Sequence, residues 1–198
     1  MSDMYYGWYS INDYGALLQT EKEFNANLAM SYLRRTGFTI YSAAGIVGNM
    51  WAESQMSPGQ WQGNTPFSGG YGLVQWTPYT LYSNWAGNEW ENNGPLEMQR
   101  LTYEKANGLE FYPSTTYPQW RWNNFTELAP TEGMTETDAV NLAASVFLYN
   151  YLRPASYNTE ATRQYHARYV FEHCHGTGSM PVWLMFKMSK TGKGDFYG

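Results

Sequence analysis

The chain has 198 residues, of which 43% are hydrophobic and 15% are charged, with a formal net charge of −5. This length suits one domain that buries its own core without disulfides or metal ions. The longest basic run is Arg34-Arg35, which excludes the clustered positive charge of a nucleic-acid-binding surface. No apolar run approaches 18 residues, so we also expect no membrane span.

Aromatic residues are frequent, at 18% of the chain, and include 18 Tyr and 9 Trp. Two interpretations remain open at this point. The rings can fill the core, or they can line a groove that stacks flat ligands. Sugars suit such a groove because their C–H faces lie on aromatic rings while their hydroxyls meet side-chain amides.

The single cysteine, Cys174, cannot form an intrachain disulfide and leaves the compartment open. Residues 1–5 lack the basic and apolar regions of a signal peptide, so we expect none. His173 and His175 flank Cys174, but successive helical residues point in different directions, and we expect no metal ion. No phosphate-binding loop or dinucleotide fingerprint is present, and we expect no cofactor. A peptidase built on Cys174 with His166 or His173 is a minor alternative.

The chain divides by composition into three parts. Residues 1–19 are rich in Tyr and Gly and are expected to form an irregular N-terminal arm. Residues 20–175 carry apolar residues at helical spacing behind capping residues, which predicts the folded domain. Residues 56–78 inside it are rich in Gly, Gln, Ser and Pro and predict a loop or short hairpin. Residues 176–198 are expected to be a linker or tail.

Within the domain, helices are expected where a capping residue or a proline precedes an apolar repeat. In chain order they begin at Thr20, Ser42, Thr77-Pro78, Gly94-Pro95, Trp120, Thr135 and Asn158. The second is very apolar and should be buried, and it ends near Glu53-Ser54. The sixth, capped by Thr135 with Asp138, is stopped by Pro154.

Glu53 stands at the end of the apolar helix, directly after Met50, Trp51 and Ala52. If its side chain points into a cleft below that helix, apolar walls disfavour the charged carboxylate. A carboxylic acid that stays protonated can donate its proton to a glycosidic oxygen. The competing interpretation is a solvated residue at a helix end, and spacing alone favours it.

Two blocks of sequence change that balance. They are Glu53–Gln62, with the sequence ESQMSPGQWQ, and Gly70–Pro78, with the sequence GYGLVQWTP. The pair resembles the double motif of goose-type lysozymes and soluble lytic transglycosylases. More closely, it resembles the phage tail lysozyme family, whose members are peptidoglycan-cleaving domains at the tips of bacteriophage tails. Phe147–Pro154 is similar to that family's late aromatic segment, but it has Leu152 where many members have a glutamate.

The resemblance covers about residues 20–175 and implies a mainly α, lysozyme-like α+β fold. In such a fold a helical core and a small hairpin or loop lobe form the substrate cleft between them. The implied reaction is that of a muramidase, which cleaves the β-1,4 bond between N-acetylmuramic acid and N-acetylglucosamine. The implied setting is the virion, in the phage tail, with a peptidoglycan glycan strand and other tail proteins as partners. The net charge of −5 gives no attraction to an anionic wall, which fits delivery by a larger assembly.

The same resemblance implies roles for individual residues. Glu53 becomes the general acid, and Gln75 holds a sugar substituent or the reacting water. Ser54 supports the glutamate, and residues 71–73 form a backbone wall of the cleft. The substrate-binding positions that it implies are Ser54, Tyr71, Gly72, Gln75, Trp76, Tyr149 and Tyr151.

Two questions stay open at the level of sequence. Sugar hydrolases ordinarily use two carboxyl groups, and none besides Glu53 lies between Glu53 and Gln75. Glu89, Glu91 and Glu97 follow with little to separate them. A lytic transglycosylase would use the same acid without water. A non-catalytic wall-binding module or structural tail component is the alternative of another class.

Overall fold

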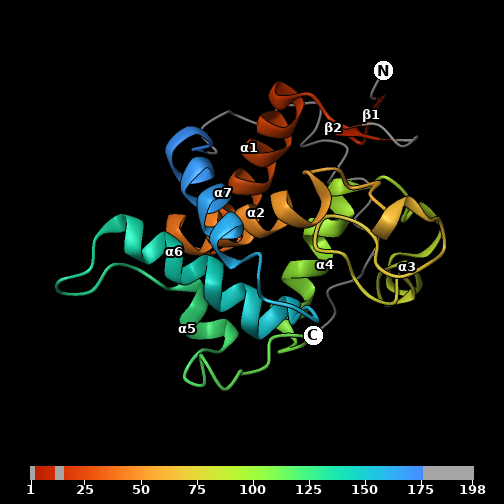
Figure 1. Cartoon of the computed structure of the whole chain (residues 1–198). Coiled ribbons are helices and arrows are strands. Elements are labelled where there is room, and N and C mark those ends of the chain that lie inside the picture. The colour runs from red at the N-terminus through yellow and green to blue at the C-terminus, as the bar shows by residue number, and fades with distance from the viewer. Residues whose placement is uncertain (1–2, 12–15, 176–198) are drawn as a thin grey trace, which may run out of the picture.

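The computed structural model describes residues 3–11 and 16–175, and over these ranges the fold is mainly α (Figure 1). The α-helices are α1 (Gln19–Arg35), α2 (Ile40–Ser54), α3 (Thr80–Ala86), α4 (Gly94–Ala106), α5 (Trp122–Thr126), α6 (Glu136–Phe147) and α7 (Glu160–His173). The shorter elements are strands β1 (Asp3–Tyr5) and β2 (Trp8–Ser10), 3-10 turns η1 (Gln62–Asn64) and η2 (Gly87–Glu89), and the π-helical turn η3 (Leu148–Leu152). The predicted fold class is confirmed, while the expected tail at 176–198 lies outside the described residues. No helix in the described ranges is long and apolar enough to cross a membrane.

Helix α2 is the centre of the core, and α1, α6 and α7 pack around it (Figure 1). Two glycines allow this close packing. A Cβ on Gly48 would lie 2.5 Å from Cα of Ala167 in α7, and one on Gly45 would lie 2.6 Å from the carbonyl carbon of Ala143 in α6. No side chain fits at such a distance, so the missing side chains bring three backbones together. The predicted burial of this helix is confirmed.

Helix starts differ from the prediction where another polar group competes for the cap. Helix α2 begins before Ser42, because the hydroxyl of Thr39 accepts a hydrogen bond from the amide of Ser42. Helix α1 begins before Thr20, because the carboxylate of Glu21 accepts one from the amide of Leu18. The predicted cap of α6 is confirmed, with Thr135 as the N-cap.

The expected irregular arm is wrong for residues 3–10, which form a β-hairpin. Tyr6 and Gly7 both have positive φ, as a two-residue hairpin turn requires. The ring of Trp8 is buried, and a Cβ on Gly94 would lie 2.3 Å from it. The side-chain amide of Asn25 in α1 accepts a hydrogen bond from the Tyr9 amide and donates one to the Tyr9 carbonyl. The hairpin is therefore packed against the helical core.

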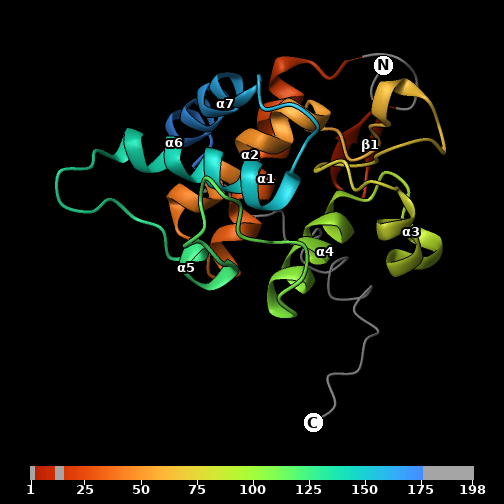
Figure 2. The same ribbon diagram turned by 60° about the horizontal axis from the view of Figure 1, so that its bottom comes forward.

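The second lobe is the segment 56–78 with the helix α3 that follows. Tyr71 forms antiparallel bridges with both Trp61 and Trp76, which confirms the predicted loop or short hairpin. An aromatic cluster holds this lobe together, with rings 4.6–6.2 Å apart: Trp61, Tyr71, Tyr79, Tyr82 and Trp90. Figures 1 and 2 both place α3 on one side of α2 and α6 on the other. The second lobe therefore lies beside the helical core, on the side of α2 opposite to α6.

Candidate active site

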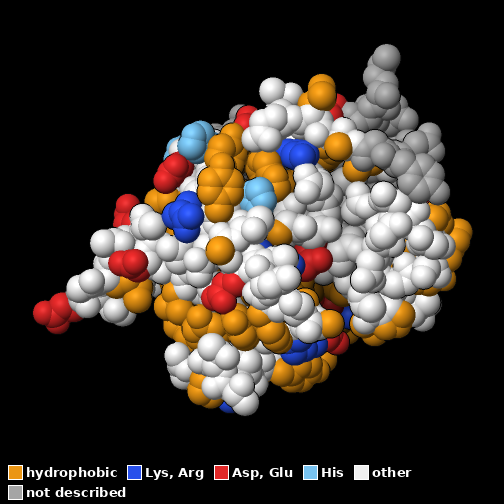
Figure 3. All heavy atoms as spheres, in the orientation of Figure 1, with side chains coloured by type: hydrophobic (Ala, Val, Ile, Leu, Met, Phe, Trp, Pro, Cys, Tyr) orange, Lys and Arg blue, Asp and Glu red, His pale blue; other side chains and the backbone are white. Residues whose placement is uncertain are grey.

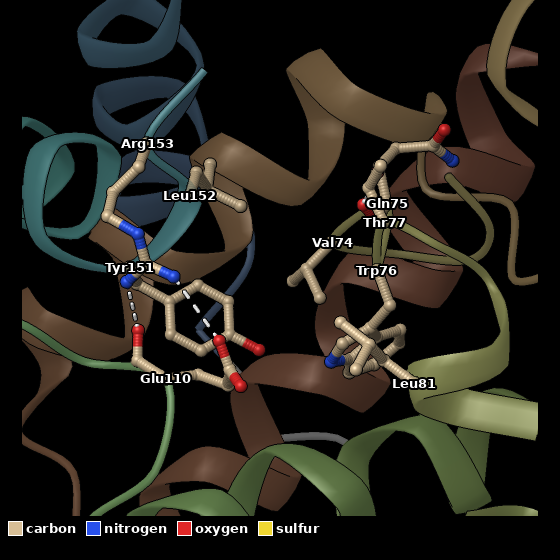
Figure 4. A pocket seen from close by; sticks show the side chains of 9 residues that line it. All are labelled: Val74, Gln75, Trp76, Thr77, Leu81, Glu110, Tyr151, Leu152 and Arg153. Carbon is tan, nitrogen blue, oxygen red and sulfur yellow. Dashed lines mark hydrogen bonds and ion pairs between the residues drawn. The ribbon is translucent and has the colours of Figure 1, made fainter. Parts of the chain in front are cut away.

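A cleft lies between the second lobe and the segment that follows α6. It consists of a larger hollow of about 400 Å³ and a smaller one of about 100 Å³. The larger is lined by Glu53, Gln60, Trp61, Gln62, Gly63, Val74, Gln75, Thr77, Leu152, Arg153, Pro154 and Ala155. The smaller, drawn in Figure 4, is lined by Val74, Gln75, Trp76, Thr77, Leu81, Glu110, Tyr151, Leu152 and Arg153. The two share five lining residues, so they adjoin each other and are together called the cleft.

Glu53 lies in the last turn of α2, and its side chain is 19% exposed in the larger hollow. Its Oε1 accepts a hydrogen bond from Nη2 of Arg163 at 2.8 Å, which forms an ion pair between α2 and α7. The Arg163 side chain is only 7% exposed. Its Nε donates to Oγ1 of Thr159 at 3.0 Å, and its Nη1 donates to Oδ1 of Asn49 at 3.1 Å. These two hydrogen bonds therefore hold the Arg163 side chain in place independently of Glu53.

This environment differs from the apolar one that the sequence predicts for Glu53. The apolar neighbours of the helix are present, since Met50 and Trp51 are buried, but the carboxylate faces an arginine. An ion pair of this kind is a contact of the ionised carboxylate. Within the described part of the chain, Oε2 of Glu53 makes no hydrogen bond, so this oxygen keeps its capacity to bind a ligand.

Gln75 lines both hollows and braces the second lobe. Its backbone is left-handed, with φ 55°, a strained conformation for a residue other than glycine. Its side-chain nitrogen donates to the carbonyl oxygens of Gln60 at 3.0 Å and Gly72 at 2.9 Å. Both N–H bonds are thereby used, which leaves the amide oxygen as the polar atom for a ligand. In Figure 4 its side chain points away from Leu152 and Arg153.

Trp76 and Tyr151 line opposite sides of the smaller hollow, and a buried carboxyl group joins them. Oε1 of Glu104 accepts from the Trp76 indole at 3.0 Å and from Nε of Arg100 at 2.6 Å. Oε2 accepts from the Tyr151 hydroxyl at 2.5 Å. Burial raises the pKa of Glu104, and these hydrogen bonds oppose the rise. Glu104 therefore ties the two walls of the cleft together beneath its surface.

The other sequence-predicted positions lie outside the two linings: Ser54, Tyr71, Gly72 and Tyr149. The hydroxyl of Ser54 donates to the Met50 carbonyl at 2.9 Å, within α2. Tyr71 is buried in the aromatic cluster, where it supports the lobe from behind. The Tyr149 hydroxyl donates to Glu160. These four residues therefore do not line the cleft.

Glu89, Glu91 and Glu97, which the sequence did not distinguish as candidate second carboxylates, lie in different environments in the structure. Glu97 is 1% exposed and lies under the lobe, where it accepts the Leu73 amide at 2.6 Å. Burial raises the pKa of Glu97 well above its usual range. Glu89 and Glu91 are exposed and outside the linings. The acidic side chain that lines the cleft besides Glu53 is Glu110, which no sequence pattern indicated.

Besides Glu110, one aromatic and one charged lining residue were not predicted from the sequence: Trp61 and Arg153. Trp61 lines the larger hollow and packs on Tyr71, with ring centroids 4.6 Å apart. It therefore belongs both to a packed aromatic cluster and to the lining of a groove, the two roles considered for the aromatic residues. Arg153 lines both hollows and pairs with Glu110 at 3.2 Å. For Arg153, the sequence signal was its place before Pro154 at the end of the late aromatic segment. For Glu110 the sequence carries no signal.

Cys174 and the histidines do not form a second site. The Cys174 side chain is buried, and burial raises the pKa of its thiol to about 12. A thiol in this state is a poor nucleophile near neutral pH. His166 stacks on Trp51 with ring centroids 5.7 Å apart, and burial lowers its pKa. In the described ranges, no group of three or more His, Cys, Asp or Glu side chains is placed to hold a metal ion.

A helical core, a short hairpin lobe and a cleft between them define a lysozyme-like domain. Residues 24–173 match the phage tail lysozyme family, and the chain belongs to that family. Over 183 residues it is 35% identical to morphogenesis protein 1 of Bacillus phage B103, a match that covers 89% of this chain and 46% of that protein. The chain thus spans about half the length of this relative. The family match identifies it as a phage lysozyme-like protein, and the relative is a phage morphogenesis protein.

Proposed function

We propose that this chain is a muramidase that cleaves the β-1,4 bond between N-acetylmuramic acid and N-acetylglucosamine, with Glu53 as the proton donor. The observation that carries the proposal is the placement of Glu53, whose carboxyl group lies at the end of a buried helix, lines the cleft and has one oxygen without a hydrogen bond among the described residues. Membership of the phage tail lysozyme family supports the same reaction class. Trp61 and the amide oxygen of Gln75 supply an apolar face and a polar acceptor for sugars.

The ion pair with Arg163 gives Glu53 a defined geometry before substrate arrives. Arg163 holds Oε1, and Oε2, which has no hydrogen-bond partner among the described residues, is the oxygen that we assign to the substrate. In this proposal Glu53 takes its proton from solvent, and the glycan strand then fills the cleft and excludes water from the carboxyl group. The proton passes from Oε2 to the glycosidic oxygen as the bond to the anomeric carbon breaks. The resulting carboxylate is again paired with Arg163 and can accept a proton from the attacking nucleophile.

Lytic transglycosylation is the second candidate, and one observation favours keeping it. A second carboxylate that activates water must be free to do so. Glu110 lines the cleft, but it is paired with Arg153. Attack by the 6-hydroxyl of the muramic acid itself needs no second carboxylate from the protein. The acid step at Glu53 is the same in both reactions.

The proposed setting is the phage tail, where the domain opens the host wall locally. Support comes from the family and from the phage origin of the relative. The partners would be the glycan strand of peptidoglycan and other tail proteins. The net charge of −5 gives the domain no attraction of its own to an anionic wall, so delivery by the tail supplies the encounter.

Digestion of purified peptidoglycan, with mass spectrometry of the fragments, tests this function. Fragments that end in a reducing muramic acid support the muramidase, and anhydro-muramic ends support the transglycosylase. The Glu53→Gln variant should release neither. A parent chain that binds the wall and releases no fragments would show a non-catalytic wall-binding component instead.

A further inference from the structure

The cleft contains a positively charged group that the proposed proton transfer does not use. Among the residues that line the two hollows, Arg153 is the one Lys or Arg side chain. Arg163 is buried, and each of its three nitrogens already has a partner. Lys and Arg side chains are also few on the face shown in Figure 3. Arg153 is thus placed where a negatively charged part of the substrate would meet it.

The Arg153 guanidinium is held rigidly from one side. Its Nη1 donates to the carbonyl oxygens of Glu110 at 2.5 Å and Asn150 at 3.0 Å, and its Nη2 lies 3.2 Å from the Glu110 carboxylate. Its Cζ lies 4.8 Å from the centroid of the Tyr112 ring. These contacts fix the plane of the guanidinium, which lowers the entropy lost when it binds a further group.

The opposite edge of the same guanidinium is open. Two of its five N–H bonds, the Nε–H and one Nη2–H, have no partner among the described residues. These two share one edge of the planar group and form the fork that binds a carboxylate through two parallel hydrogen bonds. Figure 4 shows the guanidinium beside the hollow, with Glu110 below it and Leu152 and Val74 toward the hollow.

The local backbone also fits a binding role. Arg153 and Glu110 both have positive φ, 47° and 61°, although neither is a glycine. Strained residues of this kind persist where the surroundings fix them, and they concentrate at ligand sites. The Arg153 amide donates to the Leu148 carbonyl at 2.9 Å, which holds the turn at the end of η3. The Arg153 side chain is 37% exposed, so a ligand reaches it without unfolding the wall.

We propose that Arg153 is a substrate-binding residue that recognises a carboxylate on the glycan strand, with Glu110 and Tyr112 orienting its guanidinium. This proposal rests on the function proposed above and narrows its substrate to an acidic glycan. In peptidoglycan the carboxylate belongs either to the lactyl group of muramic acid or to the stem peptide attached to it. Neutral oligomers of N-acetylglucosamine carry no such group.

Binding measured by calorimetry tests the proposal in a Glu53→Gln background, which keeps the ligands intact. Three ligands are compared: peptide-bearing glycan strands, peptide-free strands with free lactyl groups, and a neutral N-acetylglucosamine oligomer. Arg153→Gln should weaken binding of an acidic strand by about tenfold or more. It should leave the neutral oligomer within about twofold. The acidic ligand that loses affinity identifies the source of the carboxylate.

Two matched variants separate recognition from folding. Arg153→Lys keeps the charge but lacks the fork, and should recover only part of the lost affinity. Glu110→Gln keeps the backbone carbonyl and an acceptor oxygen that orient Arg153, removes the competing negative charge and should bind acidic strands more tightly than the parent. The proposal is overturned if Arg153→Gln leaves acidic strands unaffected, or weakens neutral and acidic ligands equally. The proposed function is tested separately by the digestion of peptidoglycan. It fails if the parent chain releases no wall fragments.

Discussion

Nη2 of Arg163 lies 2.8 Å from Oε1 of Glu53, and the two residues are 110 positions apart in the chain. The close packing of α2 on α7 at Gly48 makes this pair possible, because it brings Arg163 within reach of the last turn of α2. Helix α7 is therefore part of the candidate site, although both recognisable sequence blocks precede it.

Replacing Arg163 by Met should destabilise the fold by about 3 kcal/mol, because it leaves the Glu53 carboxylate and the Asn49 amide oxygen without their shared donor. Glu53 is partly exposed, which keeps the cost toward the lower end of that seen for buried pairs. Urea denaturation measures the change. The double variant with Glu53→Gln should recover part of the loss, as expected for coupled residues. Strictly additive losses would show that the two side chains do not interact.

The buried carboxyl group of Glu97 should give a pH-dependent stability. Because burial raises its pKa in the folded state, the folded protein binds more protons than the unfolded chain above the usual value of 4.5. This contribution is complete below about pH 4.5 and is lost as pH rises toward the folded-state pKa. Its slope is at most about 1.4 kcal/mol per pH unit.

Glu97→Gln removes this titration and keeps the size of the side chain. Thermal unfolding followed between about pH 5 and pH 9 should show a flatter profile for the variant than for the parent. Profiles with the same slope would mean that the Glu97 carboxyl group is already ionised in the folded protein.

Cys174 should be inert toward thiol reagents in the native state. Its side chain is buried, and its raised pKa of about 12 leaves very little thiolate at pH 8. A colorimetric disulfide reagent should react at least about a hundredfold more slowly with the native chain than with the chain in denaturant. Rapid labelling of the native chain, with loss of wall cleavage, would revive the cysteine peptidase alternative.

Patterns local in sequence predicted much of the fold. The apolar run before Glu53 indicated a buried helix, and Thr135 with Asp138 marked a helix start, because caps and helical repeats depend on neighbours within a few positions. The N-terminal hairpin was missed because its burial depends on Gly94, which is distant in the chain. The sequence pattern also did not show which of several neighbouring residues caps a helix. Helix α1 has its N-cap at Leu18, before the predicted start at Thr20.

The candidate site divides in the same way. Glu53 and Gln75 were chosen from the two sequence blocks, and both line the cleft. Arg163 and Glu110 were missed, because an ion pair or a cleft wall formed by distant segments leaves no periodic pattern in sequence. For the same reason Glu97 could not be told from its exposed acidic neighbours until its burial was known.

The rate at which the Glu53→Gln variant clears purified peptidoglycan tests the role of Glu53 most directly. Glutamine keeps the shape and can still accept the Arg163 hydrogen bond, but it has no acidic proton to give. Clearance should fall by roughly 10²- to 10⁴-fold, while Glu91→Gln, an exposed substitution outside the cleft, should match the parent. Clearance by a folded Glu53→Gln variant at the parent rate would contradict the assignment of Glu53 as the proton donor.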